Sequence, residues 1–452
     1  MSRLTAPAIV LLGAAISALL GRLTIPDALY GWDAYPLIAA ARFESIGAFF
    51  GTFTEELMDG RYPDGSFYRP VLHLMLGLEY AISGLEPSTF GIVDAAVAVL
   101  AALFVALCAT RLGAPRIAAG LAGAFVLLNP AADHVTWFMP RRPESLVVLF
   151  TSATLCAQLR PDEAGRPGKP HRSRIALSFL LALLASSSKE TGILVLPLVL
   201  LLHALERGAK GALRASAPVA AAVLLFVAVR TAVLGGLGGH PESSLTNVAD
   251  VFSHVRSQFA LVLGLSGATL ALATVPIALA AAFGVARKDT RVATLVPLVW
   301  LLGNLALSAV SGVQRPWYAY QILAPVALIA AAGSTVRGPR LALHLAVGVV
   351  LFLPLARSSV ASNRSAIDQS AHRFLVSFAD ATLAARPGNM IVVEGFSTIA
   401  SSPRINLFLH APYSLEAYAE LIGAPPTQCA LPHERPTPTR GVVTVVLSGD
   451  GS

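Results

Sequence analysis

The sequence predicts an all-α polytopic membrane protein with about 11 transmembrane helices, an external interfacial helix and a small external α/β domain at the C-terminus. Of its 452 residues, 55% are hydrophobic and only 13% are charged, and the mean hydropathy is +0.67. A soluble domain of this length carries about twice that fraction of charged residues. The apolar residues fall into runs close to the roughly 20 residues that cross a bilayer, and short basic clusters separate these runs.

The charge pattern and the cysteines exclude several classes of protein. The net charge of +7 does not indicate a nucleic-acid partner, because the basic residues are divided among short connections, where they set membrane orientation. The three cysteines (Cys108, Cys156 and Cys429) are scattered and form neither a disulfide framework nor a metal-binding spacing. The basic residues are nearly all Arg, a bias typical of GC-rich bacterial genomes. We therefore expect a multi-pass protein of the bacterial inner (plasma) membrane.

The apolar runs predict eleven spanning helices. They cover roughly 5–22, 89–110, 115–130, 144–159, 174–189, 191–206, 217–235, 265–286, 293–311, 321–335 and 341–357. Few residues precede the first run and no obvious small-residue cleavage site follows it, so we interpret it as a retained signal anchor.

Basic clusters predict the orientation of these helices. They are Arg111 with Arg116, five Arg or Lys from Arg160 to Arg174, Arg207 with Lys210 and Arg214, Arg287 with Lys288 and Arg291, and Arg337 with Arg340. All of them fall in alternate connections, as the positive-inside rule requires of cytoplasmic loops. The opposite connections, near 131–143, 189–191, 236–260 and 312–320, are then external. The N-terminus is predicted to be cytoplasmic and the C-terminus extracytoplasmic.

This orientation holds only if the apolar run at 70–85 does not cross the bilayer. His73 and Glu79 interrupt the run, Gly77 and Gly84 weaken it, and Pro70 begins it. We therefore predict that this run forms a helix in the external leaflet.

The chain divides into two predicted domains. Residues 1–357 form the transmembrane domain, in which 24–88 are the first external loop with its interfacial helices. Residues 358–452 form the external α/β domain, with an amphipathic helix over Ser359–Ala385 and short buried strands at Met390–Val393 and Val442–Leu447.

Ionisable and aromatic residues gather on the predicted external side. Asp33 follows the first helix within Leu29-Tyr-Gly-Trp-Asp-Ala-Tyr35. The others are Arg69, Asp94, Asp133, Trp137, Arg141, Arg142, Glu144, Lys189, Glu190, Arg230, Arg315, Trp317 and Tyr318. Ionisable residues at membrane depth are costly and by default mark a functional cavity.

Each of these residues also has a structural interpretation. Arg141, Arg142 and Arg315 fit cations that reach lipid headgroups, and Trp137, Trp317 and Tyr318 fit an interfacial aromatic belt. Asp94 fits a hydrogen bond to a neighbouring helix, and Lys189 with Glu190 fits a local ion pair. These interpretations do not predict that all the residues lie on one face, which is what favours a shared site.

The motifs in this set resemble those of polytopic GT-C type glycosyltransferases, which include protein O-mannosyltransferases and aminoarabinose transferase-like bacterial enzymes. The matching features are an acidic residue after the first helix (Asp33), Tyr68-Arg-Pro70 after the first loop, the series Asp133, Trp137, Arg142 and Glu144, and Ser188-Lys-Glu190 before a helix with Pro197. Together they span residues 29–197 in the family's order. Arg315-Pro-Trp-Tyr318 resembles the Arg-Tyr turn of bacterial members.

The resemblance implies a hexosyl- or pentosyltransferase that moves a sugar from a polyprenyl-phosphate donor to an extracytoplasmic acceptor with inversion. The acceptor is a lipid, a glycan or a protein, and membrane lipids surround the site. A carboxylate takes the acceptor proton, and fixed cations stabilise the leaving phosphate. The expected catalytic residues are Asp33 as the base, with Asp133 or Glu144 orienting the acceptor or bracing the cations. The expected donor-phosphate ligands are Lys189, Arg230, Arg315, Arg69 and Arg142, and the expected substrate contacts are Trp32, Tyr68, Trp137, Glu190, Trp317 and Tyr318.

Cofactor use and two rival functions stay open at this point. No cofactor is expected. A divalent metal is compatible with the resemblance, but many members carry two adjacent acidic residues in the first loop where this chain has Asp33 alone. The first rival is a transporter or lipid flippase, which tends to show internal repeats that are not visible in this sequence. The second is a non-catalytic assembly subunit of the same fold.

Overall fold

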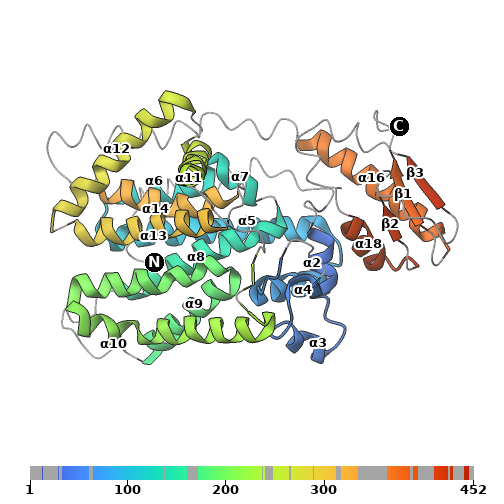
Figure 1. Ribbon diagram of the computed structural model, residues 1–452, viewed down its shortest axis with the longest axis horizontal. Helices are drawn as coiled ribbons and strands as arrows, with labels where there is room; N and C mark the ends of the chain where they lie inside the picture. The colour runs from blue at the N-terminus through green and yellow to red at the C-terminus, as the bar shows by residue number, and fades with distance from the viewer. Residues whose placement is uncertain are drawn as a thin grey trace.

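The structure is a computed structural model, and a helix bundle forms most of it (Figure 1). The described residues are 13, 29, 33–60, 65–136, 138–159, 172–236, 238–239, 248–263, 266–288, 290–311, 317–333, 364–386, 390–394, 412–425, 428–430 and 442–446. The predicted spans 5–22 and 341–357 lie outside the described residues, except for position 13.

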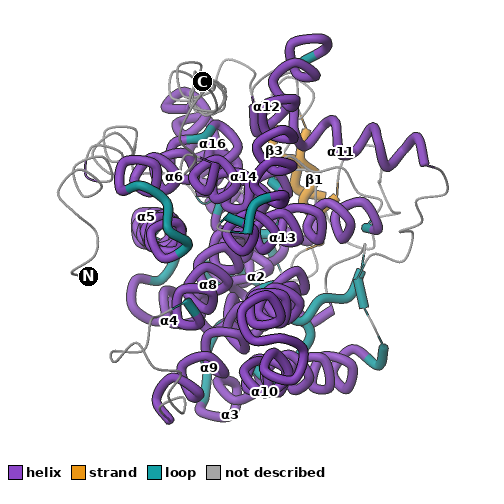
Figure 2. The backbone as a smooth tube through the Cα atoms, turned by 90° about the vertical axis from the view of Figure 1, so that its left-hand side faces the viewer, coloured by secondary structure: helices purple, strands orange, loops and turns teal. Residues whose placement is uncertain are grey.

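Three helices, α5 (Pro87–Arg111), α6 (Arg116–Leu128) and α8 (Arg142–Gln158), pack together at the centre of the bundle. Helix α14 (Tyr318–Gly333) lies against α6 and α8. The buried side chains at these contacts are often alanines, and small residues let helices approach closely where lipid offers no hydrophobic driving force. Figure 2 looks along the bundle, with α5 seen end on.

Helices α9 (Arg172–Ser188) and α10 (Val195–Leu234) extend the bundle, joined by the short 3-10 helix η3 (Glu190–Leu194). Helix α10 loses helical geometry at Gly208, where φ is 72° and ψ is 174°, a region that favours glycine. Its two helical parts correspond to the separate predicted spans 191–206 and 217–235.

The remaining bundle helices are α11 (Val248–Leu263), α12 (Gly267–Ala286) and α13 (Arg291–Val310). The sequence predicted only an external connection at 236–260, and α11 was not predicted. Its apolar positions, such as Val255 and Phe259, follow helical spacing, but Asp250, His254 and Arg256 interrupt the hydropathy that marks a span. Helix α7 (Pro130–Thr136) and the 3-10 helix η2 (Met139–Arg141) form the connection between α6 and α8.

The first external loop folds into α2 (Ala34–Ala41), α3 (Ile46–Gly51), the 3-10 helix η1 (Leu57–Gly60) and α4 (Pro70–Ser83). Helix α4 is the predicted interfacial helix, and its polar residues point into protein. The backbone N–H of Met58 donates to His73 Nε2 at 3.3 Å, and burial lowers the pKa of His73 to about 4, so the ring is a neutral acceptor at pH 7. A Cβ at Gly77 would lie 2.3 Å from the carbonyl oxygen of Ala41. This glycine therefore permits the close crossing of α2 and α4.

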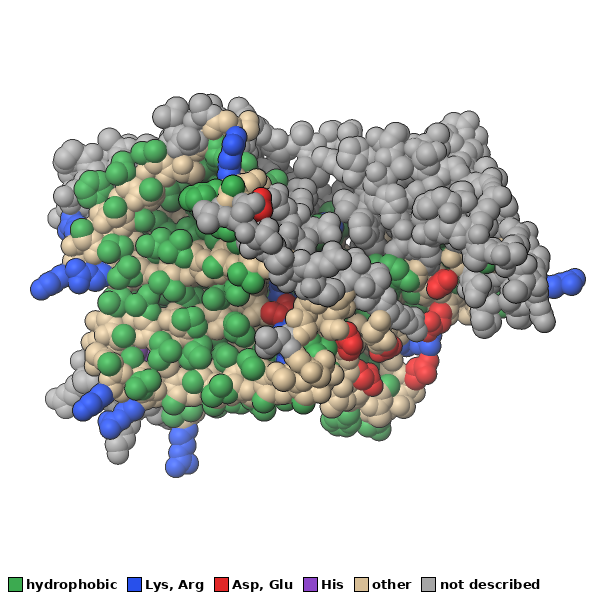
Figure 3. Space-filling model, in the orientation of Figure 1, with side chains coloured by type: hydrophobic (Ala, Val, Ile, Leu, Met, Phe, Trp, Pro, Cys, Tyr) green, Lys and Arg blue, Asp and Glu red, His purple; other side chains and the backbone are tan. Residues whose placement is uncertain are grey.

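The outer surface of the bundle is apolar. Ile117, Leu224 and Leu302 are each more than half exposed. Figure 3 shows hydrophobic side chains over the bundle, Lys and Arg side chains at its left-hand edge, and Asp and Glu side chains gathered towards the C-terminal elements. Soluble proteins rarely expose apolar patches of this extent, so the surface is that of a membrane protein.

Three stretches of the described chain are long and apolar enough to cross a membrane by length and composition: Pro87–Arg111, Glu190–Leu234 and Arg291–Val310. The count of eleven spans stays a prediction. Helix α4 has 14 residues, which rise about 21 Å, less than the roughly 30 Å of a bilayer core. Helix α6, a predicted span, is similarly short, so length alone does not decide which of them crosses.

We expect α4 to remain on one side of the membrane, so that Thr54→Cys and Ser88→Cys, placed singly in a background without native cysteines, both react with an impermeant maleimide in intact cells. The exposed Lys210, in a predicted cytoplasmic connection, supplies the control Lys210→Cys, which should react only after permeabilisation. Reaction of only one of the two external positions in intact cells would show that α4 crosses.

The C-terminal elements form a three-stranded parallel sheet with two helices. The strands β1 (Met390–Glu394), β2 (Gln428–Ala430) and β3 (Val442–Val446) are arranged in the order β2-β1-β3. Helices α16 (Arg364–Ala384) and α18 (Pro412–Leu421) accompany them. Phe374, Phe378, Ile391 and Leu415 share a small buried core. Two of the strands were predicted and β2 was not, because three residues are too short for a periodicity signal. The domain boundary at 357/358 stays a prediction.

Candidate active site

A polar cavity of about 380 Å³ opens where η3, α10, α13 and α14 meet the residues that precede α4. Its charged lining residues are Arg69, Lys189, Glu190 and Arg230, and Asn304, Tyr318 and Gln321 also line it. The cavity brings together five residues of the predicted external face that are up to 249 positions apart in sequence, from Arg69 to Tyr318.

Lys189 precedes η3 and is held by Glu144 at the start of α8. Their side chains form an ion pair, with exposed fractions of 8% and 4%. Gln321 donates to the other oxygen of Glu144. The Lys189 ammonium also lies 4.4 Å from the centroid of the Tyr318 ring, within the range of a cation–π contact. Helices α8 and α14 thus fix the ammonium at the wall of the cavity.

Glu190 lies between two arginines. Its carboxylate oxygens are 3.3 Å from Arg69 Nη2 and 3.8 Å from Arg230 Nη2. Burial disfavours the charged guanidinium of Arg69, but Glu190 and the more distant Glu144 outweigh burial, and the pKa of Arg69 is raised. Lys189 and Glu190 therefore do not form the local pair that their adjacency suggested, since each has its own partners on other elements.

The cavity carries an excess of positive charge. Three cations and two carboxylates, Glu144 and Glu190, leave one positive charge unbalanced in the cluster. Among the described residues, the Nε–H groups of Arg69 and Arg230 are buried donors without a hydrogen-bond partner, while the acceptors Glu190 Oε1 and Asn304 Oδ1 also lack a hydrogen bond. Unsatisfied buried donors are costly, and guanidinium groups match phosphate oxygens geometrically. The arrangement can therefore receive an anion such as a phosphate.

A glycine allows the tight turn that aims Lys189 and Glu190. A Cβ at Gly192 would lie 2.1 Å from the carbonyl oxygen of Ala185, so η3 packs directly on the end of α9. The backbone N–H of Gly192 donates to the carbonyl of Lys189 at 2.9 Å. Close to this turn, Ser66 and Gly239 exchange backbone hydrogen bonds of 3.3 and 2.7 Å, joining the loop before Arg69 to the chain after α10.

Arg142, predicted to be a donor-phosphate ligand, does not line the cavity. Its side chain is fully buried and donates to Asp94 Oδ1 at 2.6 Å, to both oxygens of Glu79, and to the carbonyl of Phe90 at 3.3 Å. The guanidinium joins α4, α5 and α8. Asp94 accepts a hydrogen bond from a neighbouring helix, as its structural interpretation predicted. Arg142 holds these three helices together and does not line the cavity.

Asp33 also lies outside the lining of this cavity. It precedes α2, and its carboxylate makes no capping hydrogen bond to that helix. Tyr413 Oη of α18 donates to Asp33 Oδ1 at 2.8 Å instead. Helix α2, which follows Asp33, packs against α4, and α4 begins directly after the cavity residue Arg69.

The other predicted site residues have varied positions. Tyr68 is buried, donates to the carbonyl of Phe53 at 2.8 Å and stacks on Phe226, so it anchors the first loop. The guanidinium carbon of Arg141 lies over the Trp317 ring, 3.6 Å from the centroid of that ring. Asp133 belongs to α7, but its side chain is outside the description. Trp32, Trp137 and Arg315 lie outside the described residues.

Two cavity residues, Asn304 and Gln321, were not predicted from the sequence. Both are buried amides in apolar helices. Polar side chains in such helices signal a function or a helix contact, so the signal was present.

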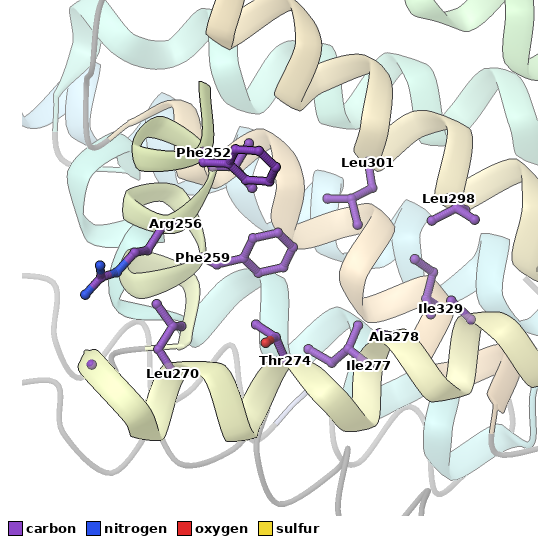
Figure 4. A pocket seen from close by; sticks show the side chains of 13 residues that line it. Phe252, Arg256, Phe259, Leu270, Thr274, Ile277, Ala278, Leu298, Leu301 and Ile329 are labelled. Atoms are coloured by element: carbon purple, nitrogen blue, oxygen red, sulfur yellow. The ribbon is translucent and has the colours of Figure 1, made fainter. Parts of the chain in front are cut away.

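A second, apolar cavity of about 690 Å³ lies between α11, α12, α13 and α14. Figure 4 shows Phe252 and Phe259 of α11 facing Leu301 and Leu298 of α13 across it, with Leu270, Thr274 and Ile277 of α12 below, while the Arg256 guanidinium points away. On α13, Leu301 lines the apolar cavity and Asn304 lines the polar one. Residues three positions apart share a helix face, so the two cavities follow one side of α13.

No metal site is evident in the part of the chain that the structure describes, where no three His, Cys, Asp or Glu side chains gather closely enough to hold an ion. The expectation that the protein needs no metal stays a prediction.

No protein-family model matches the chain, and no curated protein matches it by sequence. Solved structures do match in fold. Archaeal oligosaccharyltransferase AglB from Archaeoglobus fulgidus, in complex with an inhibitory peptide and a dolichol-phosphate, has a TM-score of 0.54 at 13% identity. The match covers 94% of this chain and 64% of AglB, so the chain spans less than two thirds of that protein's length.

ArnT from Cupriavidus metallidurans bound to undecaprenyl phosphate has a TM-score of 0.55 at 13% identity, over 93% of this chain and 85% of ArnT. The apo state of ArnT gives 0.56 at 14% identity. At these identities the likeness establishes the fold alone, so this chain shares its fold with AglB and ArnT.

Proposed function

We propose that the protein is a membrane glycosyltransferase that moves a sugar from a polyprenyl-phosphate donor to an acceptor outside the cytoplasm, with inversion. The observation that carries this proposal is the polar cavity with its excess positive charge, next to an apolar cavity on the same side of α13. A donor with a phosphate and a long apolar chain has matching chemistry. The fold shared with AglB and ArnT and the lipid phosphates named with them support this assignment.

In the proposed site, Lys189, Arg69 and Arg230 bind the donor phosphate. Their charges stabilise the negative charge that develops on the phosphate oxygen as the bond to the sugar breaks. Glu144 and Glu190 hold these cations in place, so that little reorganisation accompanies the reaction. Glu144 and Glu190 thus brace the cations. The lipid chain of the donor lies in the apolar cavity.

The proposed reaction is a single displacement. The acceptor hydroxyl oxygen attacks the anomeric carbon of the sugar, the bond from that carbon to the phosphate oxygen breaks, and polyprenyl phosphate leaves. The acceptor proton passes to a carboxylate. We assign this role to Asp33, which is half-buried and does not cap its own helix. Because the attack and the departure occur on opposite faces, the configuration at the anomeric carbon inverts.

The proposal is tested with purified protein in detergent, supplied with candidate polyprenyl-phosphate sugars and acceptors. Release of polyprenyl phosphate that depends on acceptor supports a transferase. A flippase would move the lipid across reconstituted vesicles without releasing it. A non-catalytic subunit would bind the donor, or neither bind nor release it, and either result would contradict the proposal.

Lys189→Ala should strongly reduce donor use, because it removes the buried ammonium from the cavity wall. Lys189→Arg should restore only part of it, since a planar guanidinium places its donors differently from a compact ammonium. Donor KM and kcat are measured with the folded fraction determined by gel filtration. Lys210→Ala, which alters an exposed Lys on α10 away from the cavity, is the matched control. Normal donor use by folded Lys189→Ala would remove this residue from the proposed site.

A further inference from the structure

The C-terminal elements reach the proposed catalytic carboxylate through helix α18. Tyr413, its second residue, donates a 2.8 Å hydrogen bond to Asp33 Oδ1, across 380 positions of sequence. Asp is a favoured N-cap residue whose side chain usually accepts from its own helix. Asp33 occupies that position before α2 without doing so. Its carboxylate is therefore directed at α18 at the cost of a capping interaction.

This hydrogen bond is part of a continuous docking surface between α18 and α2. The Tyr418 and Tyr35 rings lie 4.7 Å apart between centroids. Glu420 lies 3.7 Å from Arg42 at the far end of α2. The apolar residues Ala417 and Leu421 of α18 are buried in the same core cluster as Leu37 and Leu76.

A buried face of this kind fixes α18 relative to α2 and so determines where the Tyr413 hydroxyl lies. Hydrogen bonds to charged groups are among the stronger ones in proteins. An aspartate has two side-chain torsions, and a donor held by a packed helix restricts both. A general base must lie within hydrogen-bond reach of the proton that it removes, so restriction of the carboxylate bears directly on turnover.

We propose that Tyr413 is a positioning residue for Asp33, so that the elements after residue 364 complete the catalytic site of the helix bundle. The inference rests on the proposed function, because it gives Tyr413 a role only through Asp33 acting as the base. It assigns the C-terminal elements a part in the reaction that neither cavity shows, since Tyr413 lines neither of them. No direct contact of Tyr413 with substrate is involved.

The test is Tyr413→Phe, which deletes one hydroxyl and keeps the ring. We expect kcat to fall roughly 10–100-fold, since small displacements of a catalytic group are costly, while donor KM stays unchanged. Tyr418→Phe is the matched control on the same helix. It removes a hydroxyl that faces α2 without contacting Asp33, and its kcat should stay within about twofold of the wild-type value.

A double variant separates positioning from a general structural effect. If Tyr413 acts through Asp33, adding Tyr413→Phe to Asp33→Asn should cause no further loss of kcat, because the base is already absent. Full additivity of the two changes, or normal kcat in Tyr413→Phe, overturns the inference while leaving the proposed function intact. Near-normal turnover in Asp33→Asn alone would remove Asp33 as the base, which is a failure of the proposed function.

Discussion

Asp33→Asn should lower turnover by about 10²–10⁴-fold, the range that general base catalysis typically contributes. Asn keeps the size of the side chain and still accepts the Tyr413 hydrogen bond, but it does not take up a proton at neutral pH. Donor KM and the amount of folded protein should therefore remain near wild-type values. Turnover is measured as acceptor-dependent release of polyprenyl phosphate by the purified protein.

Two further variants make this result specific to the position and to the charge. Asp33→Glu should recover little activity, because an extra methylene displaces the carboxylate beyond what catalytic geometry tolerates. Asp380→Asn, an exposed carboxylate on α16, is the matched control and should be neutral. If Asp33→Asn turns over normally and Asp133→Asn does not, the base is Asp133 in α7.

Arg142→Leu should destabilise the protein by roughly 3–5 kcal/mol, the usual cost of leaving buried charges without their partner. Glu79 and Asp94 would both remain in the interior, with exposed fractions of 8% and 3%, and no other cation contacts them among the described residues. The expected result is a clear fall in the midpoint of thermal unfolding in detergent. Arg116→Leu, at an exposed position, should leave the midpoint nearly unchanged.

Restoring neutrality should rescue the fold. The triple variant Arg142→Leu, Glu79→Gln and Asp94→Asn removes the unpaired charges together, so its midpoint should return most of the way to the wild-type value. Donor KM in folded Arg142→Lys should be close to normal, because this side chain does not reach the polar cavity. A large change in donor KM with little change in stability would return Arg142 to the donor-phosphate ligands.

Much of the fold and some of the site follow from local features of the sequence. Apolar runs of helical length predict α5, α8, α9 and α13 within a few residues. The polar residues within α4 and the proline at its start predict that this helix, unlike the predicted spans, does not cross the bilayer. Buried charge between apolar runs predicts that Lys189 and Glu190 line a cavity, since only a polar site makes such residues tolerable in a membrane. These properties depend on hydropathy and spacing along the chain, and a single sequence contains both.

The choice of partners was decided only by the tertiary structure. The sequence left Lys189 beside Glu190, yet Lys189 pairs with Glu144 while Glu190 lies between Arg69 and Arg230. The sequence also predicted that Arg142 is a phosphate ligand, and it gave no indication of a role for Tyr413. Which charges meet depends on how each helix is rotated and how neighbouring helices are offset, and the apolar pattern does not fix either when a helix is hydrophobic on most of its faces. Small residues such as Gly192 and Gly77 then set the closest approaches, and these approaches determine which side chains reach one another.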